Sequence, residues 1–72
     1  MRTALRRARL RAGLTQSEVA RRVGLTRVSY TNIERGYKNP SVLTALRIAR
    51  LLGKPVEELF DDDPLSTGVQ NM

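Results

Sequence analysis

The sequence of 72 residues predicts an all-α fold of five short helices in one small domain. Apolar residues recur at helical spacing, and residues that start or stop helices occur at regular points along the chain. No segment has the alternating pattern that is typical of a strand. A domain of this size buries only about 60% of its unfolded surface, so a second subunit would add stability.

The first predicted helix covers residues 3–12. These residues have high helix propensity, and Gly13 follows them at the position where a helix end favours glycine. Helical spacing predicts that Leu5, Ala8 and Ala12 face the core of the domain.

Two further helices are predicted within residues 15–36. Thr15 and Glu18 form a T-x-x-E pattern, a capping box that satisfies two backbone donors and starts a helix. Gly24 interrupts the pattern where a tight or left-handed turn favours a residue without a Cβ. Thr26 is a suitable N-cap for the next helix, which a later glycine ends. Two short helices around a glycine-containing turn are typical of the helix-turn-helix motif.

A helical wheel divides the second helix of this motif into two faces, at about 100° per residue. Tyr30 and Ile33 lie on one side with Thr26, whereas Ser29 and Glu34 lie on the flanks. The opposite face carries Arg27, Val28, Thr31, Asn32 and Arg35. Such side chains suit base edges, because arginine binds guanine, asparagine binds adenine, and small methyl groups contact thymine. The alternative is the ordinary solvated face of an amphipathic helix.

The last two predicted helices follow a loop at residues 37–40. Ser41 is a suitable N-cap for a helix that ends at Gly53, and residues 55–60 form a short final helix that starts with proline. The predicted core stripe of the fourth helix is Val42, Ala45, Leu46, Ala49 and Leu52. The apolar anchors of the final helix are Val56, Leu59 and Phe60.

The net charge of +6 is unevenly distributed. All 13 Lys and Arg residues lie in residues 1–54, where only Glu18 and Glu34 oppose them and leave +11. Residues 55–72 contain five acidic residues and no basic one. A basic domain attracts phosphate backbones and releases their counterions. A cationic surface that only aids solubility is the alternative, and charge alone does not separate DNA from RNA or from an anionic membrane.

Composition argues against several classes of function. The chain has no Cys and no His, which removes disulfides, thiolate and imidazole chemistry, and the usual zinc sites. It has no phosphate-binding glycine motif and no group of residues arranged for acid–base or nucleophilic catalysis. The adjacent aspartates at 61–63 lack the spacing of a calcium loop and favour a solvated acidic turn. We therefore expect no enzyme, no cofactor and no metal site.

No apolar run approaches the length of a membrane span, and the N-terminus lacks the apolar segment of a secretion signal. We therefore expect a cytoplasmic protein without a membrane partner. The polar composition of residues 64–72 predicts a flexible tail after a domain at residues 1–63.

Several segments together resemble a known family. They are G-L-T-Q-S-E-V-A at 13–20, V-G-L-T at 23–26, N-I-E-R-G at 32–36, and N-P-S with A-L-R-I-A-R-L-L at 39–52. The chain resembles the phage repressor and Cro proteins, or XRE-type helix-turn-helix family, over about residues 3–60. The final P-V-E-E-L-F resembles compact single-domain regulators, which often dimerise. The resemblance implies a lambda-repressor-like bundle of five helices that binds double-stranded DNA and regulates transcription, most simply as a repressor.

The resemblance also implies roles for individual residues. The base-reading positions are Arg27, Val28, Asn32 and, as a fourth, Thr31. The phosphate-contacting positions it implies are Gln16, Arg35, Lys38 and Asn39, and we expect Ser29 and Tyr37 to contact phosphate as well. Gln16 matches a residue that also braces a neighbouring side chain, and Arg9 and Glu34 match an ion pair between the first and third helices. Tyr30 departs from the usual aliphatic residue, so either its hydroxyl finds a partner beside the core or it reaches the DNA backbone.

Apolar residues outside the predicted core stripe favour a homodimer. The predicted interface comprises Ile48, Leu51, Pro55, Val56 and Leu59. Exposed apolar patches on small domains often mark association sites, and a two-fold dimer suits a pseudo-palindromic operator. The alternative is that the fifth helix covers these residues within one subunit.

Two other functions remain open at this point. One is an antitoxin or adaptor whose main partner is a protein, with DNA binding secondary. The other is a basic structural or RNA-binding domain without sequence preference.

Overall fold

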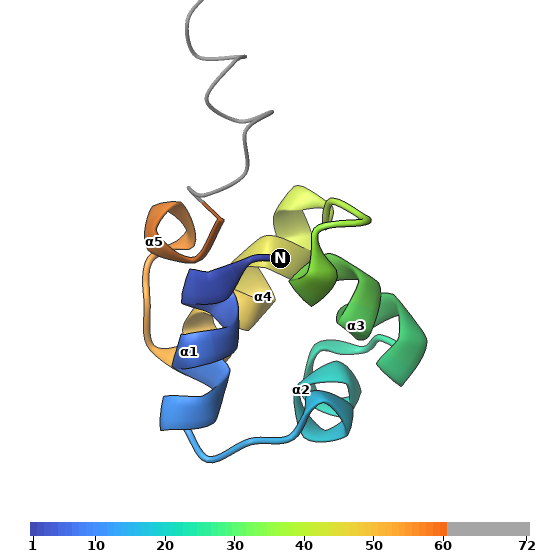
Figure 1. Ribbon diagram of the computed structural model, residues 1–72, viewed down its shortest axis with the longest axis horizontal. Coiled ribbons are helices and arrows are strands. Elements are labelled where there is room, and N and C mark those ends of the chain that lie inside the picture. The colour runs from blue at the N-terminus through green and yellow to red at the C-terminus, as the bar shows by residue number, and fades with distance from the viewer. Residues whose placement is uncertain (61–72) are drawn as a thin grey trace, which may run out of the picture.

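The computed structural model describes residues 1–60, so the expected domain end at 63, the acidic turn at 61–63 and the tail at 64–72 lie outside it. In the described part the chain forms five helices and no strand, which confirms the predicted fold class (Figure 1). The helices are α1 (Thr3–Arg11), α2 (Gln16–Val23), α3 (Arg27–Arg35), α4 (Val42–Leu52) and α5 (Val56–Phe60).

The helix-turn-helix pair, α2 and α3, begins and ends where local chemistry predicts. The Thr15 hydroxyl accepts from the Glu18 backbone N–H at 3.1 Å, and the Glu18 carboxylate accepts from the Thr15 N–H at 2.8 Å. Gly24 ends α2 with a φ of 80°, a left-handed conformation that strains residues with a Cβ. The Thr26 side chain then caps α3. These contacts span at most three residues, so they form from local sequence alone.

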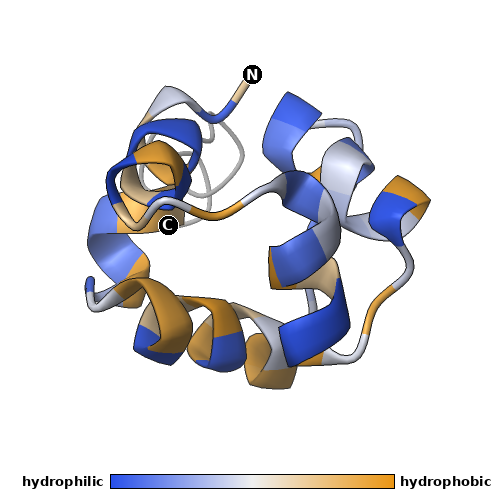
Figure 2. Cartoon of the chain, turned by 90° about the horizontal axis from the view of Figure 1, so that it is seen from below, coloured by the Kyte–Doolittle hydropathy of each residue, from blue (hydrophilic) through white to orange (hydrophobic). Residues whose placement is uncertain are grey.

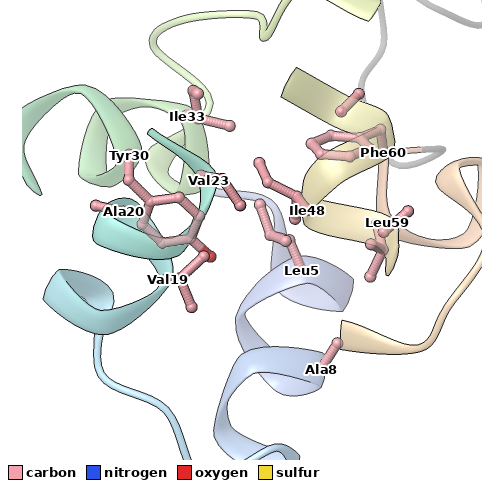
Figure 3. Packing of buried hydrophobic residues seen from close by; sticks show 12 residues of the cluster. Leu5, Ala8, Val19, Ala20, Val23, Tyr30, Ile33, Ile48, Leu59 and Phe60 are labelled. Carbon is pink, nitrogen blue, oxygen red and sulfur yellow. The ribbon is translucent and has the colours of Figure 1, made fainter. Parts of the chain in front are cut away.

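One apolar core lies among the five helices (Figure 3). Leu5 of α1 and Ile48 of α4 lie near its centre, and both are fully buried. The ring of Tyr30 fills the side toward α2, whereas Leu59 and Phe60 close the side toward α5. Figure 2 shows both hydrophobic and hydrophilic residues along the helices, because each helix buries only part of its circumference.

The buried face of α4 differs from the predicted stripe. Ala45 and Ala49 are buried as expected, but Val42 and Leu46 are 79% and 40% exposed, and Ile48 is fully buried. The helix packs against α2 as well as α5, and these contacts turn its buried face by roughly 60° from the predicted one. A smaller correction concerns Ala12, which is exposed because it follows the last residue of α1.

The predicted dimer interface needs a related correction. Ile48 and Leu59 are core residues of the subunit, and Leu51 and Val56 are half-buried against that core. Only Pro55 of the predicted set is exposed. The helix α5 packs against α1 and α4, so most of this apolar surface is covered within one chain. The apolar residues that α4 leaves exposed include Val42, Leu43 and Leu46.

Candidate nucleic-acid interface

The helix α3 turns one face into the domain and the other toward solvent. The buried face consists of Tyr30, Ile33 and Glu34. On the other side Arg27, Val28 and Arg35 are exposed, and Thr31 and Asn32 are half-buried. The residues expected to read bases therefore share one accessible face, and Val28 is the most exposed apolar residue among them at 66%.

Ser29 belongs to the N-terminal cap of α3. Its backbone N–H donates to the Thr26 hydroxyl at 3.1 Å, and the Thr26 hydroxyl donates to the Ser29 hydroxyl oxygen at 3.0 Å. The Ser29 hydroxyl oxygen therefore accepts one hydrogen bond, and the hydroxyl hydrogen of Ser29 is left to donate to another group. A donor in the first turn of a helix is well placed for an anion, because the free backbone N–H groups there also favour negative charge.

A buried ion pair joins α3 to α1. Nε of Arg9 donates to Oε2 of Glu34 at 2.8 Å, and Nη2 donates to Oε1 at 3.2 Å. The remaining nitrogen, Nη1, donates to the backbone carbonyl of Leu14 at 2.9 Å. Arg9 therefore holds both α3 and the segment between α1 and α2, and this fixes the position of the helix-turn-helix pair relative to the core.

The pair shifts the ionisation of both partners. Burial alone would raise the pKa of Glu34, but hydrogen bonds from Arg9, Gln16 and Tyr30 and the charge of Arg9 outweigh it and lower the pKa below its usual value. The hydrogen bond to Glu34 likewise raises the pKa of the Arg9 guanidinium. Both groups are therefore charged at neutral pH.

Tyr30 has a structural role rather than a contact with the DNA backbone. Its side chain is fully buried, and its hydroxyl donates to Oε2 of Glu34 at 2.9 Å. Burial, followed by the nearby negative charge of Glu34, raises the pKa of the Tyr30 hydroxyl. The phenol thus remains protonated, and Glu34 supplies the hydrogen-bond partner that a buried tyrosine hydroxyl requires.

Gln16, at the first position of α2, links this buried network to the exposed face of α3. Its Nε2 donates to Oε1 of Glu34 at 3.0 Å, and its Oε1 accepts from the Thr31 hydroxyl at 3.2 Å. The side chain is half-buried, and these two hydrogen bonds fix its position. Of the phosphate-contacting candidates, Gln16 is thus the one attached to the ion pair.

The loop after α3 carries the remaining phosphate-contacting candidates. Tyr37, Lys38 and Asn39 are all exposed, and Tyr37 is 76% exposed. The backbone N–H groups of Tyr37 and Lys38 donate to the Asn32 carbonyl at 2.9 and 3.2 Å, which closes the end of α3. Their side chains therefore extend from a fixed backbone beside Arg35.

Arg2 is a residue of this region that the sequence analysis missed. It is 4% exposed and donates to the carbonyls of Ile33 and Lys38 and, at 2.6 Å, to Oδ1 of Asn39. Its guanidinium also lies over the ring of Phe60, 5.5 Å from the centroid. The acceptors lie 31 to 37 residues along the chain, so no local pattern identifies them. Arg2 positions the loop and turns the amide nitrogen of Asn39 away from itself.

Comparison with known proteins agrees with the helix-turn-helix fold. A family model described as helix-turn-helix matches residues 5–59. The chain belongs to the Cro/C1-type helix-turn-helix family of transcriptional regulators. This regulator is 47% identical over 66 residues to an uncharacterised HTH-type transcriptional regulator of Methanothermobacter thermautotrophicus, covering 88% of this chain and 96% of that protein.

Other relatives carry similar names. An uncharacterised HTH-type transcriptional regulator of Archaeoglobus fulgidus is 42% identical, over 90% of this chain and 96% of that protein. The cryptic phage CTXphi transcriptional repressor RstR of Vibrio cholerae is 33% identical, over 81% of this chain and 52% of that protein. No solved structure matches the chain. The names of the relatives support the conclusion that this chain is a DNA-binding regulator of transcription. The family is one of transcriptional regulators and not of enzymes.

The charged groups of this helix-turn-helix regulator favour an anionic partner. The two acidic residues of the basic segment are both occupied, Glu34 by the buried network and Glu18 by the capping box. Most arginines of the first four helices, in contrast, are exposed. Within residues 1–60 no acidic cluster suitable for a metal ion and no helix long and apolar enough to cross a membrane occurs.

The role of Arg2 is testable in this regulator. We expect Arg2→Met to weaken binding to all DNA duplexes to a similar degree, because the loop that carries Lys38 and Asn39 loses two hydrogen bonds from Arg2, and α3 loses a third at the Ile33 carbonyl. The matched control is Arg6→Met, which removes the same charge from an exposed position of α1. Fluorescence anisotropy at several salt concentrations measures both. Equal losses in the two variants would show that only charge matters.

Proposed function

We propose that this protein is a sequence-specific repressor that binds its operator as a homodimer, with each α3 in a major groove. The observation that carries the proposal is that α3 has a buried face and an exposed face. Glu34 on the buried face is held by its ion pair with Arg9, whereas Arg27 and Val28 on the other face are exposed. A rigidly held helix with accessible polar side chains suits base reading, and the flanking loop suits contact with phosphates.

Repression is proposed rather than activation because one relative, RstR, is named as a transcriptional repressor. A small DNA-binding domain represses most simply by occupying a site that other proteins need. The described residues contain no second domain that would contact the transcription machinery. A reporter gene behind the selected operator is expected to lose expression when the protein is supplied, and a gain of expression would overturn this part of the proposal.

Arg27 is proposed to read a base directly. Arg27→Ala is expected to cost about 1–3 kcal/mol on the preferred site and to relax the preference at one base pair, because arginine binds guanine with two hydrogen bonds. Selection of bound sites from randomised DNA measures the preference before and after the change. Unaltered preferences at every position would show that Arg27 does not read the sequence.

Comparison of Lys38→Ala with Arg27→Ala separates backbone contact from base reading, and Arg6→Ala is the control for loss of charge. Lys38→Ala is expected to weaken all sequences alike and to reduce the salt dependence of binding, because a lysine on phosphate carries no sequence information. Arg6→Ala removes one exposed charge from α1 and is expected to leave base preferences intact.

The homodimer is proposed to form over the groove between α4 and α5. The exposed side chains of Val42 and Leu46 line this groove together with Pro55, Val56 and Phe60, and its volume is about 860 Å³. The groove is walled on one side by α5, which lies across the domain from α3 in Figure 1, and it extends to Asn39 and Pro40 of the loop after α3. None of the described residues that line it belongs to α3, so a second copy there leaves the exposed face of α3 free.

Sedimentation of paired variants tests the dimer. Leu46→Asp is expected to give monomers, because Leu46 lines the groove, whereas Leu43→Asp changes an exposed leucine outside the lining and is expected to remain dimeric. Only monomers of the unaltered protein at high micromolar concentration, with and without operator DNA, would overturn the proposal.

A further inference from the structure

The hydrogen bonds around Glu34 have a defined direction. Both carboxylate oxygens accept, Oε2 from Arg9 and Tyr30 and Oε1 from Arg9 and Gln16. An ionised carboxylate has about four acceptor positions and no hydrogen to donate. Four N–H and O–H donors therefore fill it, and each of them must point its hydrogen toward Glu34.

This direction determines how the amide of Gln16 is turned. A carboxylate accepts only from the NH₂ end of an amide, so Nε2 of Gln16 faces Glu34 at 3.0 Å. The carbonyl end, Oε1, must then face Thr31, whose hydroxyl oxygen lies 3.2 Å away. A carbonyl oxygen carries no hydrogen, so the hydrogen of this contact belongs to Thr31.

A threonine hydroxyl has one hydrogen and two acceptor positions. In Thr31 the hydrogen is used by Gln16, so the oxygen has only acceptor positions left for a further partner. An unconstrained threonine pairs with donors and acceptors alike on base edges. The chain of bonds from Glu34 through Gln16 removes this freedom from a side chain on the reading face of α3.

We propose that Thr31 is a specificity-determining residue that reads DNA only as a hydrogen-bond acceptor, with its polarity set by the buried Glu34 through Gln16. The hydroxyl then favours a base that presents an amino group in the major groove, namely adenine at N6 or cytosine at N4. Guanine and thymine present only acceptors there, so pairing with either requires Thr31 to give up its bond to Gln16. This inference rests on the proposed base-reading role of α3.

The test uses site selection from randomised DNA, followed by titration of four duplexes that differ at one base pair. The relevant position is the one at which Thr31→Val, which keeps the shape but removes the hydroxyl, changes the preference. The unaltered protein is expected to favour adenine or cytosine there by about tenfold, the equivalent of one well-placed hydrogen bond. Thr31→Val is expected to abolish this preference.

Gln16→Met is the decisive variant. It keeps the length of the side chain but removes the acceptor, so the Thr31 hydroxyl is free to rotate. Guanine and thymine are then expected to bind within about twofold of adenine and cytosine, even though total affinity falls with the loss of the amide. Gln16→Ala removes the same acceptor with less bulk and is expected to agree. Ser17→Ala, at an exposed neighbouring position of α2, is the control and is expected to leave the preference unchanged.

Several outcomes overturn this inference alone. Since every base pair contains one adenine or cytosine, the first is an unchanged affinity when the amino group of that base is removed from the preferred duplex. The others are an orientation preference of the base pair that survives in both Gln16 variants, and a preference that Thr31→Val alters at no position. Binding to DNA without any sequence preference in the unaltered protein would instead overturn the proposed function, and this inference with it.

Discussion

Replacement of Arg9 by methionine is expected to lower the free energy of unfolding by about 3–5 kcal/mol, the usual cost of leaving a buried charge without its partner. Glu34 is 1% exposed and would lose two of its four donors, and the Leu14 carbonyl would lose its bond to Nη1. A domain of about 60 residues has a total stability of only about 3–9 kcal/mol. Urea denaturation followed by circular dichroism measures the loss, and an unfolded variant is its upper limit.

Two comparisons identify the cause. Arg6→Met removes an exposed arginine from the same helix and is expected to cost less than about 0.5 kcal/mol. A double variant, Arg9→Met with Glu34→Met, removes both charges and is expected to regain part of the loss, since apolar replacement of a whole buried pair is often tolerated. If the double variant is less stable than the sum of the two single changes predicts, the ion pair does not explain the loss.

The same network predicts how stability depends on pH. The pKa of Glu34 is lowered in the folded state, so its contribution is fully present above the ordinary carboxyl pKa of about 4.3 and is lost as pH falls through the lower folded value. The free energy of unfolding is therefore expected to fall between neutral pH and strongly acidic pH, with part of the slope due to Glu34. Glu34→Gln is expected to flatten that slope, and an unchanged slope would exclude Glu34 as a cause.

Ile48→Ala is the second change with a large expected effect, a loss of about 2–5 kcal/mol. Ile48 is fully buried in the middle of the core beside Leu5, and the smaller side chain leaves a cavity there (Figure 3). The natural comparison is Leu46→Ala, two residues earlier on the same helix. Leu46 is 40% exposed, and its replacement is expected to cost less than about 1 kcal/mol in the monomer.

Denaturation at low protein concentration, where a dimer would dissociate, measures the free energy of unfolding of both variants as monomers. The opposite ranking, with Leu46→Ala more costly than Ile48→Ala, would support the stripe that the helical wheel predicts and contradict the packing of α4 described above. The ranking is thus a direct experimental check on the rotation of this helix.

The fold could be predicted from sequence because its helix boundaries depend on nearby residues. The capping box of Thr15 and Glu18 and the left-handed Gly24 act over a few residues. Thr26 and Ser41 likewise accept from the backbone three residues ahead. The solvent-facing side of α3 was also predictable, because a single helix with one apolar edge has one orientation that buries it.

The buried face of α4 could not be predicted in this way. Nearly every turn of α4 carries several apolar residues, so the wheel admits more than one orientation. The choice between Leu46 and Ile48 depends on how α2 and α5 enclose the helix, which is a property of the packed domain. The same reason explains why Ile48 and Leu59 were expected at a dimer interface although they are core residues.

By itself, the sequence determined the five helices, the basic character of their surface and the residues that α3 presents to solvent. Only the tertiary structure decided which side chains hold the helices and the loop after α3 in place. Arg2 reaches Asn39 across 37 residues, and Gln16 joins Glu34 to Thr31 across two helices. The physical reason is range: a cap or a turn is satisfied by neighbours in the chain, whereas a buried donor is satisfied by whatever acceptor the packed helices bring within 3 Å or so of it.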